Sequence, residues 1–236
     1  MLILVLAEAS LETIPKKLWS APSVKAMAKR RGKTPSEMLL DRSYHHRAMK
    51  NLPNAEKRGR PDIVHFCLLT ALSTPLNREG QLKVYVHTIN DQIIDVDPKV
   101  RLPRNYLRFV GLMEQLFKTG RVPPKGPPLL QLREWNLEKL IEREKPDHVV
   151  ALTSRGELQP LASALGKLAK LERLMALVGG FPHGEFSQKT LSLAQTLLAV
   201  DPEPLDSWTV VARLVYEYER ATSITKSRLQ APRQPQ

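Results

Sequence analysis

The chain has 236 residues, enough to bury a core as one domain, and its 42% hydrophobic content excludes disorder throughout. Lys and Arg outnumber Asp and Glu by 36 to 24, and this net charge of +12 points to a polyanionic partner such as nucleic acid. The single cysteine, Cys67, excludes an internal disulfide and a cysteine-based metal site, and is typical of a protein of the reducing cytoplasm.

The first half of the chain predicts a buried strand followed by helices. Residues 1–7 are apolar, but the run is too short for a membrane span and lacks the basic residues that precede a secretory signal. We therefore expect a buried strand there and no membrane partner. Residues 24–32 and 35–40 predict two short helices, and the nearly continuous apolar run at 62–72 predicts a buried helix.

A hairpin and a long helix follow. Residues 82–88 and 92–96 alternate in polarity around a turn at Asn90 and Asp91, which predicts two paired strands. A helix is expected from Pro103, in its first turn, to about Lys118. The proline- and glycine-rich residues 119–128 then connect the two parts of the chain.

The second half alternates strands with helices. The expected strands are residues 148–152, 175–178 and 196–200, and the expected helices are 158–171, 187–194 and one that Asp206 or Ser207 caps. This alternation indicates an α/β fold with a parallel sheet covered by helices on both faces. The polar tail from residue 230 to 236 is expected to be disordered.

Each strand of the second half ends in a loop suited to ligand binding. The loops are Thr153 to Gly156, the glycine-rich residues 179–186 and the proline-bearing residues 201–205. Ligands of open parallel sheets bind beyond the carboxyl ends of the strands, and glycine allows a close approach of the backbone. The sequence has neither a dinucleotide nor a triphosphate motif, and a purely structural turn remains an alternative for the glycine-rich loop.

Arginines form a second group of candidate residues. Arg60 stands beside the carboxylate of Asp62, and Arg101, Arg104 and Arg108 follow in the region of the predicted helix. Guanidinium groups spaced one helical turn apart suit RNA phosphates, although a solvated helix face is the alternative interpretation. The histidines have no metal-ligand spacing, so no metal site is expected.

Four of these segments together resemble one family, the ribosome-biogenesis pseudouridine methyltransferases of archaea and eukaryotes, which belong to the SPOUT or α/β-knot superfamily. The segments are R-P-D-I-V-H-F-C-L-L at 60–69, L-P-R-N-Y-L-R-F-x-G-L-M-x-Q-L at 102–116, G-G-F-P-H-G-E-F at 179–186 and P-E-P-L-D-S-W-T-V-V-A-R-L-V-Y-E-Y-E at 202–219. They occur in order and span nearly the whole chain.

The resemblance implies a homodimer that methylates the N-1 nitrogen of a pseudouridine in small-subunit ribosomal RNA with S-adenosylmethionine. It implies a C-terminal trefoil knot and a single domain over residues 1–229, with an inserted RNA-binding extension within about 20–128. Arg60, Arg101, Arg104 and Arg108 are the implied RNA contacts. The implied cofactor residues are Leu152, Thr153, Gly179, Gly180, Gly184, Glu185, Phe186, Ala199, Val200, Asp201, Pro202, Glu203, Pro204 and Leu205.

Two questions remain open at this level. Asp62 either orients Arg60 or accepts the proton that leaves N-1, and the first role is favoured because neighbouring arginines stabilise a carboxylate in its ionised form. The alternatives for the whole protein are an RNA-binding assembly factor with dispensable methyl transfer and a knotted transfer-RNA methyltransferase.

Overall fold

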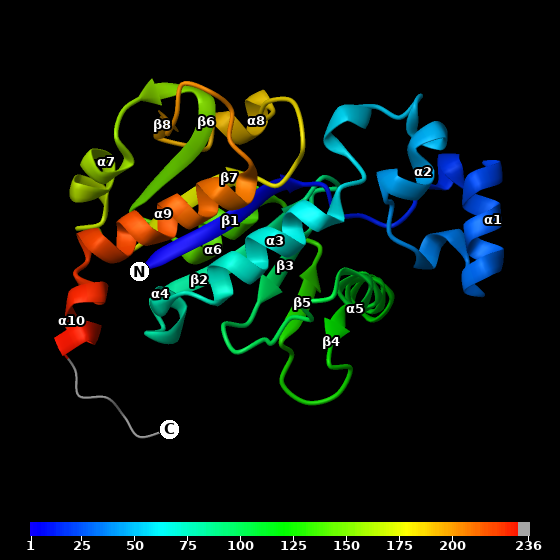
Figure 1. Cartoon of the computed structure of the whole chain (residues 1–236), viewed down its shortest axis with the longest axis horizontal. Coiled ribbons are helices and arrows are strands. Elements are labelled where there is room, and N and C mark those ends of the chain that lie inside the picture. The colour runs from blue at the N-terminus through cyan, green and yellow to red at the C-terminus, as the bar shows by residue number, and fades with distance from the viewer. Residues whose placement is uncertain (231–236) are drawn as a thin grey trace.

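One mixed sheet organises the computed structural model, which describes residues 1–230 (Figure 1). Its eight strands within those residues have the order β4-β5-β3-β2-β1-β7-β6-β8. The strands are β1 (Leu2–Ala9), β2 (Leu82–Thr88), β3 (Ile93–Val96), β4 (Arg121–Val122), β5 (Leu130–Arg133), β6 (His148–Leu158), β7 (Leu174–Gly179) and β8 (Thr196–Ala199). Strands β2, β1, β7, β6 and β8 are parallel, whereas β3, β5 and β4 add to the sheet as antiparallel strands.

The prediction of an α/β fold is confirmed and its parallel strands form the centre of the sheet, but the sheet as a whole is mixed. The predicted hairpin exists as β2 and β3, yet β2 pairs with the central strand β1 and so belongs to the main sheet. Antiparallel strands can join through a short turn, which lets β3 extend the sheet without a crossover helix. Strands β4 and β5, short and partly polar, are not evident in the sequence pattern.

Helices cover both faces of the sheet, which explains why β1 is apolar at nearly every position. Leu4 of β1 belongs to the core on one face, to which α3 (Pro61–Leu72), α5 (Tyr106–Thr119), α7 (Leu161–Leu168) and α9 (Ser207–Ala221) also contribute. Val5 points to the other face, toward α6 (Leu137–Glu144) and the residues that follow α8 (Gln188–Leu191). The short helices α4 (Pro75–Arg78) and α10 (Ile224–Gln230) flank α9.

A small helical module stands beside the sheet, at the right of Figure 1. It contains η1 (Lys16–Leu18), α1 (Pro22–Arg31), η2 (Pro35–Glu37), α2 (Arg42–Met49) and η3 (Ala55–Lys57), and we call residues 14–60 the basic module. It has its own core, built around Val24, Met38 and Met49, which is separate from the two cores of the sheet.

Several predicted boundaries are wrong for local reasons. The long helix α5 begins at Tyr106 and not near Pro103, because the side chain of Asn105 accepts a hydrogen bond from the Arg108 amide at 3.1 Å and so caps the helix. The helix expected at 35–40 is only the 3-10 turn η2, closed by a capping box between Thr34 and Glu37.

The ends of the C-terminal elements also differ from prediction. Strand β6 continues through the expected loop to Leu158, and α7 begins only at Leu161. Helix α9 begins at Ser207 with Asp206 in the N-cap position, as predicted, but Asp206 forms no side-chain capping hydrogen bond. Gln230 ends α10 and is therefore helical, and the tail expected at 231–236 lies outside the described residues.

Candidate active site

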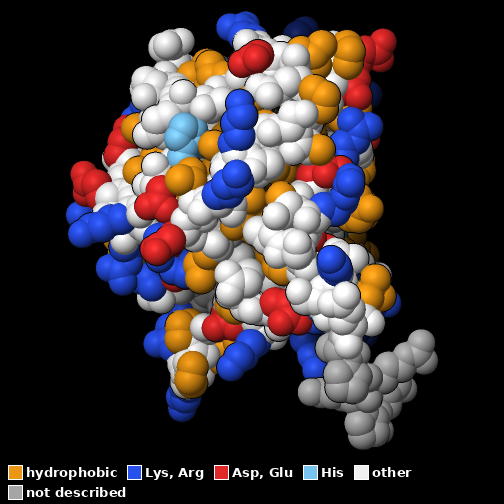
Figure 2. Space-filling view, turned by 90° about the vertical axis from the view of Figure 1, so that its left-hand side faces the viewer, with side chains coloured by type: hydrophobic (Ala, Val, Ile, Leu, Met, Phe, Trp, Pro, Cys, Tyr) orange, Lys and Arg blue, Asp and Glu red, His pale blue; other side chains and the backbone are white. Residues whose placement is uncertain are grey.

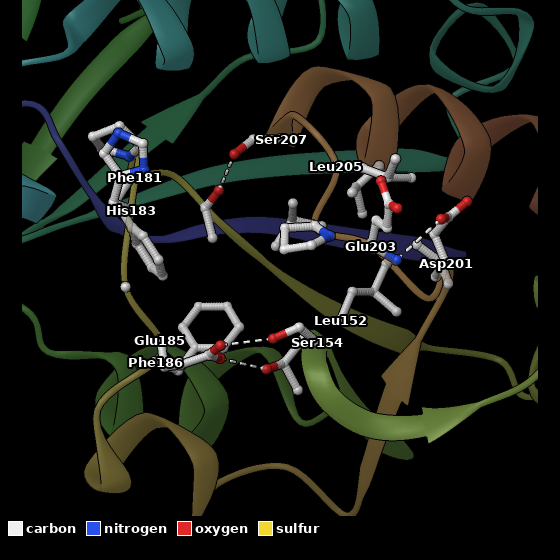
Figure 3. Close-up of a pocket in the computed structure, with 18 residues that line it drawn as sticks. Leu152, Ser154, Phe181, His183, Glu185, Phe186, Asp201, Glu203, Leu205 and Ser207 are labelled. Atoms are coloured by element: carbon white, nitrogen blue, oxygen red, sulfur yellow. Dashed lines mark hydrogen bonds between the residues drawn. The ribbon is translucent and has the colours of Figure 1, made fainter.

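The middle of β6, where its pairing with β8 shifts register between Leu152 and Glu157, and the segments that follow β7 and β8 line a cavity of about 340 Å³ (Figure 3). Its lining is Leu152, Thr153, Ser154, Val178, Gly179, Phe181, Pro182, His183, Gly184, Glu185, Phe186, Val200, Asp201, Glu203, Pro204, Leu205, Ser207 and Val210. An apolar lining with a few polar groups in a cavity of roughly 300–1,000 Å³ is typical of a small-molecule site.

Hydrogen bonds between the loops shape this cavity. The Glu185 carboxylate accepts hydrogen bonds from the hydroxyls of Thr153 at 3.0 Å and Ser154 at 2.6 Å, which joins the loop after β7 to the middle of β6. The Ser207 hydroxyl donates to the carbonyl of Gly179 at 2.6 Å, which joins β7 to α9. The loops therefore form one connected wall (Figure 3).

The third loop is held by Asp201. One carboxylate oxygen accepts from the Glu203 amide at 3.2 Å, and the other accepts from Arg213 of α9 at 3.1 Å. The Glu203 amide and then Arg213 lower the pKa of Asp201, so this carboxylate is ionised near neutral pH.

Most of the residues predicted to bind the cofactor line the cavity. These are Leu152, Thr153, Gly179, Gly184, Glu185, Phe186, Val200, Asp201, Glu203, Pro204 and Leu205. Ala199, Pro202 and Gly180 are not part of the lining.

Gly180 has a different environment from the one expected. A Cβ at this position would lie 2.7 Å from the Cβ and 2.8 Å from the Cα of Ala9. The glycine therefore allows β7 to approach the end of β1, which is a packing requirement. A larger residue here is expected to damage the fold and not only ligand binding.

Some lining residues were not predicted. Val178 is the last apolar residue before the glycine pair, and Val210 lies on the apolar face of α9, so both patterns indicate core positions. Ser207 was considered only as a helix cap. The loop residues Ser154, Phe181, Pro182 and His183 lay within the predicted loops but carried no assigned role.

Arg60 and Asp62 form the predicted pair next to the cavity. The guanidinium donates to both carboxylate oxygens, with Nη2 2.7 Å from Oδ2 and Nε 2.8 Å from Oδ1. The hydrogen bond to Asp62 raises the pKa of Arg60, and the negative charge of Asp206 adds to this effect. Since Asp206 immediately precedes the cavity residue Ser207, the pair lies near the third loop. The Arg60 amide also donates to the Ser10 hydroxyl at 2.7 Å, beyond the end of β1.

The other three arginines remain available to a ligand. Arg101, Arg104 and Arg108 are exposed, and none forms an ion pair with a carboxylate of residues 1–230. Arg104 lies before α5, so it and Arg108 do not share a helical face as expected. A hydrogen bond of 2.7 Å between His65 Nε2 and the Pro103 carbonyl fixes the segment that carries Arg104.

Residues 1–230 contain no group of His, Cys, Asp and Glu side chains arranged to hold a metal ion. Cys67 is buried in α3, and burial raises the pKa of its thiol, so it is an unreactive core residue. Among the helices of residues 1–230, none combines the length and the apolar character that a membrane span requires.

A cavity at the carboxyl ends of parallel strands, beside exposed arginines, defines a cofactor-dependent α/β enzyme that acts on an anionic substrate. The chain matches the model of the EMG1/NEP1 methyltransferase family over residues 4–219, and it belongs to this family.

Similar proteins agree with this assignment. The ribosomal RNA small subunit methyltransferase Nep1 of Thermococcus kodakarensis is 47% identical over 224 residues, which cover 95% of this chain and 100% of that protein. The Nep1 of Thermococcus onnurineus is 48% identical over 221 residues, covering 93% and 98%. The crystal structure of Archaeoglobus fulgidus Nep1 bound to S-adenosylhomocysteine superimposes with a TM-score of 0.83 at 40% identity, covering 93% of this chain and 98% of that one.

Proposed function

We propose that this protein transfers a methyl group from S-adenosylmethionine to the N-1 nitrogen of a pseudouridine in small-subunit ribosomal RNA, and so supports biogenesis of the small ribosomal subunit. The observation that carries the proposal is the position of the Arg60–Asp62 pair beside a cavity built by the three loops of a methyltransferase family member.

The residues of the cavity fit the cofactor. Leu152, Val178 and Val210 offer an apolar surface that would suit an adenine ring, and Glu185 and Asp201 are carboxylates in the same lining that would suit a cationic cofactor. When bound, S-adenosylmethionine supplies an activated methyl group, and a sulfonium needs no metal for this chemistry.

The protein must then present N-1 and remove its proton. Arg101, Arg104 and Arg108 are exposed cations suited to RNA phosphates, and they would fix the register of the strand. Orientation of this kind supplies much of the rate in a direct group transfer. Arg60 is half-exposed and held by Asp62, so it can contact the target nucleotide in a defined geometry.

Asp62 is proposed to orient Arg60, and a role as general base is the alternative. With Asp62 as an orienting residue, Asp62→Asn and Arg60→Ala should lower the methylation rate at saturating RNA to a similar extent, because each breaks the same pair. Single-turnover assays with labelled cofactor measure this rate. Loss of methylation with intact RNA binding in Asp62→Asn, together with loss of binding alone in Arg60→Ala, would favour the general base.

Mass spectrometry of small-subunit ribosomal RNA tests the reaction itself. After incubation with the protein and labelled S-adenosylmethionine, the expected product is a pseudouridine that carries one methyl group on N-1. A label found only on transfer RNA would indicate the other substrate class. Tight RNA binding without any transfer would indicate an assembly factor.

The proposal includes three finer structural points. RNA binding is assigned to the parts of residues 20–128 that lie outside the parallel strands, within a single domain of residues 1–229. A trefoil knot in the C-terminal part is proposed because the chain belongs to the EMG1/NEP1 family, whose superfamily has this feature. A homodimer is supported by Phe66, an exposed aromatic side chain that a second copy of the chain would cover. Phe66 contacts Trp208, the residue after the cavity residue Ser207, with ring centroids 5.4 Å apart. Sedimentation velocity tests the dimer. The cytoplasm is the proposed location.

A further inference from the structure

The side chain of Lys57 extends from the basic module to the wall of the cavity. Its ammonium lies 2.7 Å from a carboxylate oxygen of Glu8, at the end of β1, and it donates a second hydrogen bond to the carbonyl of Glu185. The same ammonium lies 4.6 Å from the centre of the Phe181 ring. A Cβ on Gly184 would be 3.2 Å from Cε of Lys57. One buried ammonium therefore contacts Phe181 and Glu185 of the loop that lines the cavity, and its side chain lies close to the backbone of Gly184.

Glu8 is an ionised partner in a constrained position. Burial by itself would raise its pKa, but hydrogen bonds from Lys57 and from Ser187 hold the pKa below its ordinary value. The second carboxylate oxygen accepts from the Ser187 amide at 2.8 Å, so Glu8 also holds the end of the same loop. Glu8 has a φ of 51°, a conformation that costs energy for a residue with a Cβ.

The next residue along the chain forms a comparable pair with no contact to the cavity. Arg58 donates to both oxygens of Glu12, at 2.7 and 2.6 Å; Arg58 is about as buried as Lys57, and Glu12 is more buried than Glu8. Buried ion pairs often contribute little net stability, because desolvation offsets the attraction between the charges. The two pairs differ in what they touch, and only Lys57 reaches Phe181, Gly184 and Glu185.

We propose that Lys57 is a positioning residue for the cofactor: it holds the loop of residues 181–186 in the conformation that binds S-adenosylmethionine. The inference rests on the cofactor site proposed above. It also gives the basic module a role in cofactor binding, through a side chain three residues before Arg60. Three hydrogen bonds fix the loop: one from Lys57 to the backbone of Glu185 and two from Thr153 and Ser154 to its carboxylate.

The test compares Lys57→Met with Arg58→Met by calorimetric titration of S-adenosylhomocysteine and by urea unfolding. Both variants lose the cation of a buried pair, so both should unfold at lower urea concentration. Only Lys57→Met should bind the ligand more weakly, by about tenfold or more, the effect of losing one hydrogen bond to a charged group. In steady-state assays its KM for S-adenosylmethionine should rise, while kcat at saturating cofactor stays near that of the wild type.

The double variant Glu8→Gln with Lys57→Met separates positioning from stability and covers the case in which Lys57→Met does not fold. Removing the unpaired carboxylate should restore much of the stability, whereas affinity for S-adenosylhomocysteine should stay low. Recovery of both properties, or equal loss of affinity in Arg58→Met, would overturn the role of Lys57. If the wild-type protein does not bind S-adenosylhomocysteine, the proposed cofactor site itself is refuted.

Discussion

The basic module and the C-terminal part of the chain, residues 148–221, differ in net charge and therefore suit different ligands. Residues 16–60 contain 13 Lys and Arg but only 3 Asp and Glu, so they carry +10 of the net charge of +12. Residues 148–221 contain 7 Lys and Arg and 8 Asp and Glu, and are close to neutral. Figure 2 shows acidic and basic side chains interspersed on the side of the molecule away from the basic module.

The two regions also differ in how their shape is produced. The basic module packs around a small core of its own, and its charged side chains need only to be exposed. The cavity requires backbone segments to pass within contact distance of one another, as Gly156 and Leu198 do. A charged surface thus tolerates many sequences, whereas the cavity depends on individual residues.

The largest expected effect is on the C-terminal part. In Gly156→Ala the new methyl group would lie 2.4 Å from backbone atoms of Leu198, so two strands must separate. We expect a decrease of about 3 kcal/mol or more in the free energy of unfolding, at the upper end of overpacking effects. Gly166→Ala in α7 is the matched control, with no atom within 4 Å, and should stabilise the protein by about 0.5–1 kcal/mol. Chemical denaturation measures both, and equal stability of the two variants would contradict a requirement for close packing of Gly156 on Leu198.

The second effect concerns the attachment of the basic module. Glu114 of α5 is buried and accepts hydrogen bonds from Arg31 and Lys33, each at 2.6 Å, and from the Leu39 amide at 3.2 Å. Glu114→Ala should loosen the module by about 1–3 kcal/mol, since a buried amide loses its partner. Hydrogen exchange should increase in residues 14–60 and stay unchanged in β1 and β7. Faster exchange throughout the protein would show that the module and the sheet unfold as one unit.

The third effect is on RNA binding. Replacing Arg101, Arg104 or Arg108 by Ala should reduce the slope of log affinity against log salt concentration by up to about one unit for each RNA phosphate that the variant no longer binds. Affinity for S-adenosylhomocysteine should not change, because none of the three lines the cavity. Filter binding over a series of salt concentrations measures the slope. An unchanged slope in all three variants would identify the arginines as solvated surface residues.

The smallest effect is a difference in pH dependence. Burial lowers the pKa of His45 in the basic module, against the opposing charge of Asp41, while Arg31 adds to the lowering. The folded module therefore favours the neutral ring, and its stability is complete above the unfolded pKa of about 6.5 and decreases below it. The lowered pKa of Glu8 contributes stability to the sheet that disappears only when the pH falls below about 4.5.

Hydrogen exchange at pH 7.5 and 5.5 measures this difference in the module. His45→Gln should remove the pH dependence of hydrogen exchange in residues 14–60. The pH dependence of exchange in α3 should remain, because burial also lowers the pKa of His65 there. If hydrogen exchange in residues 14–60 depends on pH equally in the variant and in the wild type, groups other than His45 control the loss of stability at low pH.

The sequence by itself determined the features that depend on short-range patterns. Apolar strands with covered faces, the hairpin of β2 and β3, the buried helix α3 and the loops after β7 and β8 all follow from the spacing of apolar residues, glycines and prolines, whereas the loop expected at Thr153 to Gly156 is part of β6. The Arg60–Asp62 pair joins residues only two positions apart and was predictable for the same reason. Four motifs in order were sufficient to indicate the family to which the chain belongs.

Only the tertiary structure decided which residues far apart in the chain come together. It placed Gly180 against Ala9 instead of in the cavity, brought Gly156 of β6 into close contact with the Leu198 backbone of β8, and brought Lys57 to a carbonyl 128 residues away. It also added β3, β5 and β4 to a parallel sheet as antiparallel strands. The local pattern of apolar residues indicates which side of a helix or strand is buried, but it does not indicate which other element packs against that side. The packing of the whole chain determines the contacting element, because each contact depends on the others.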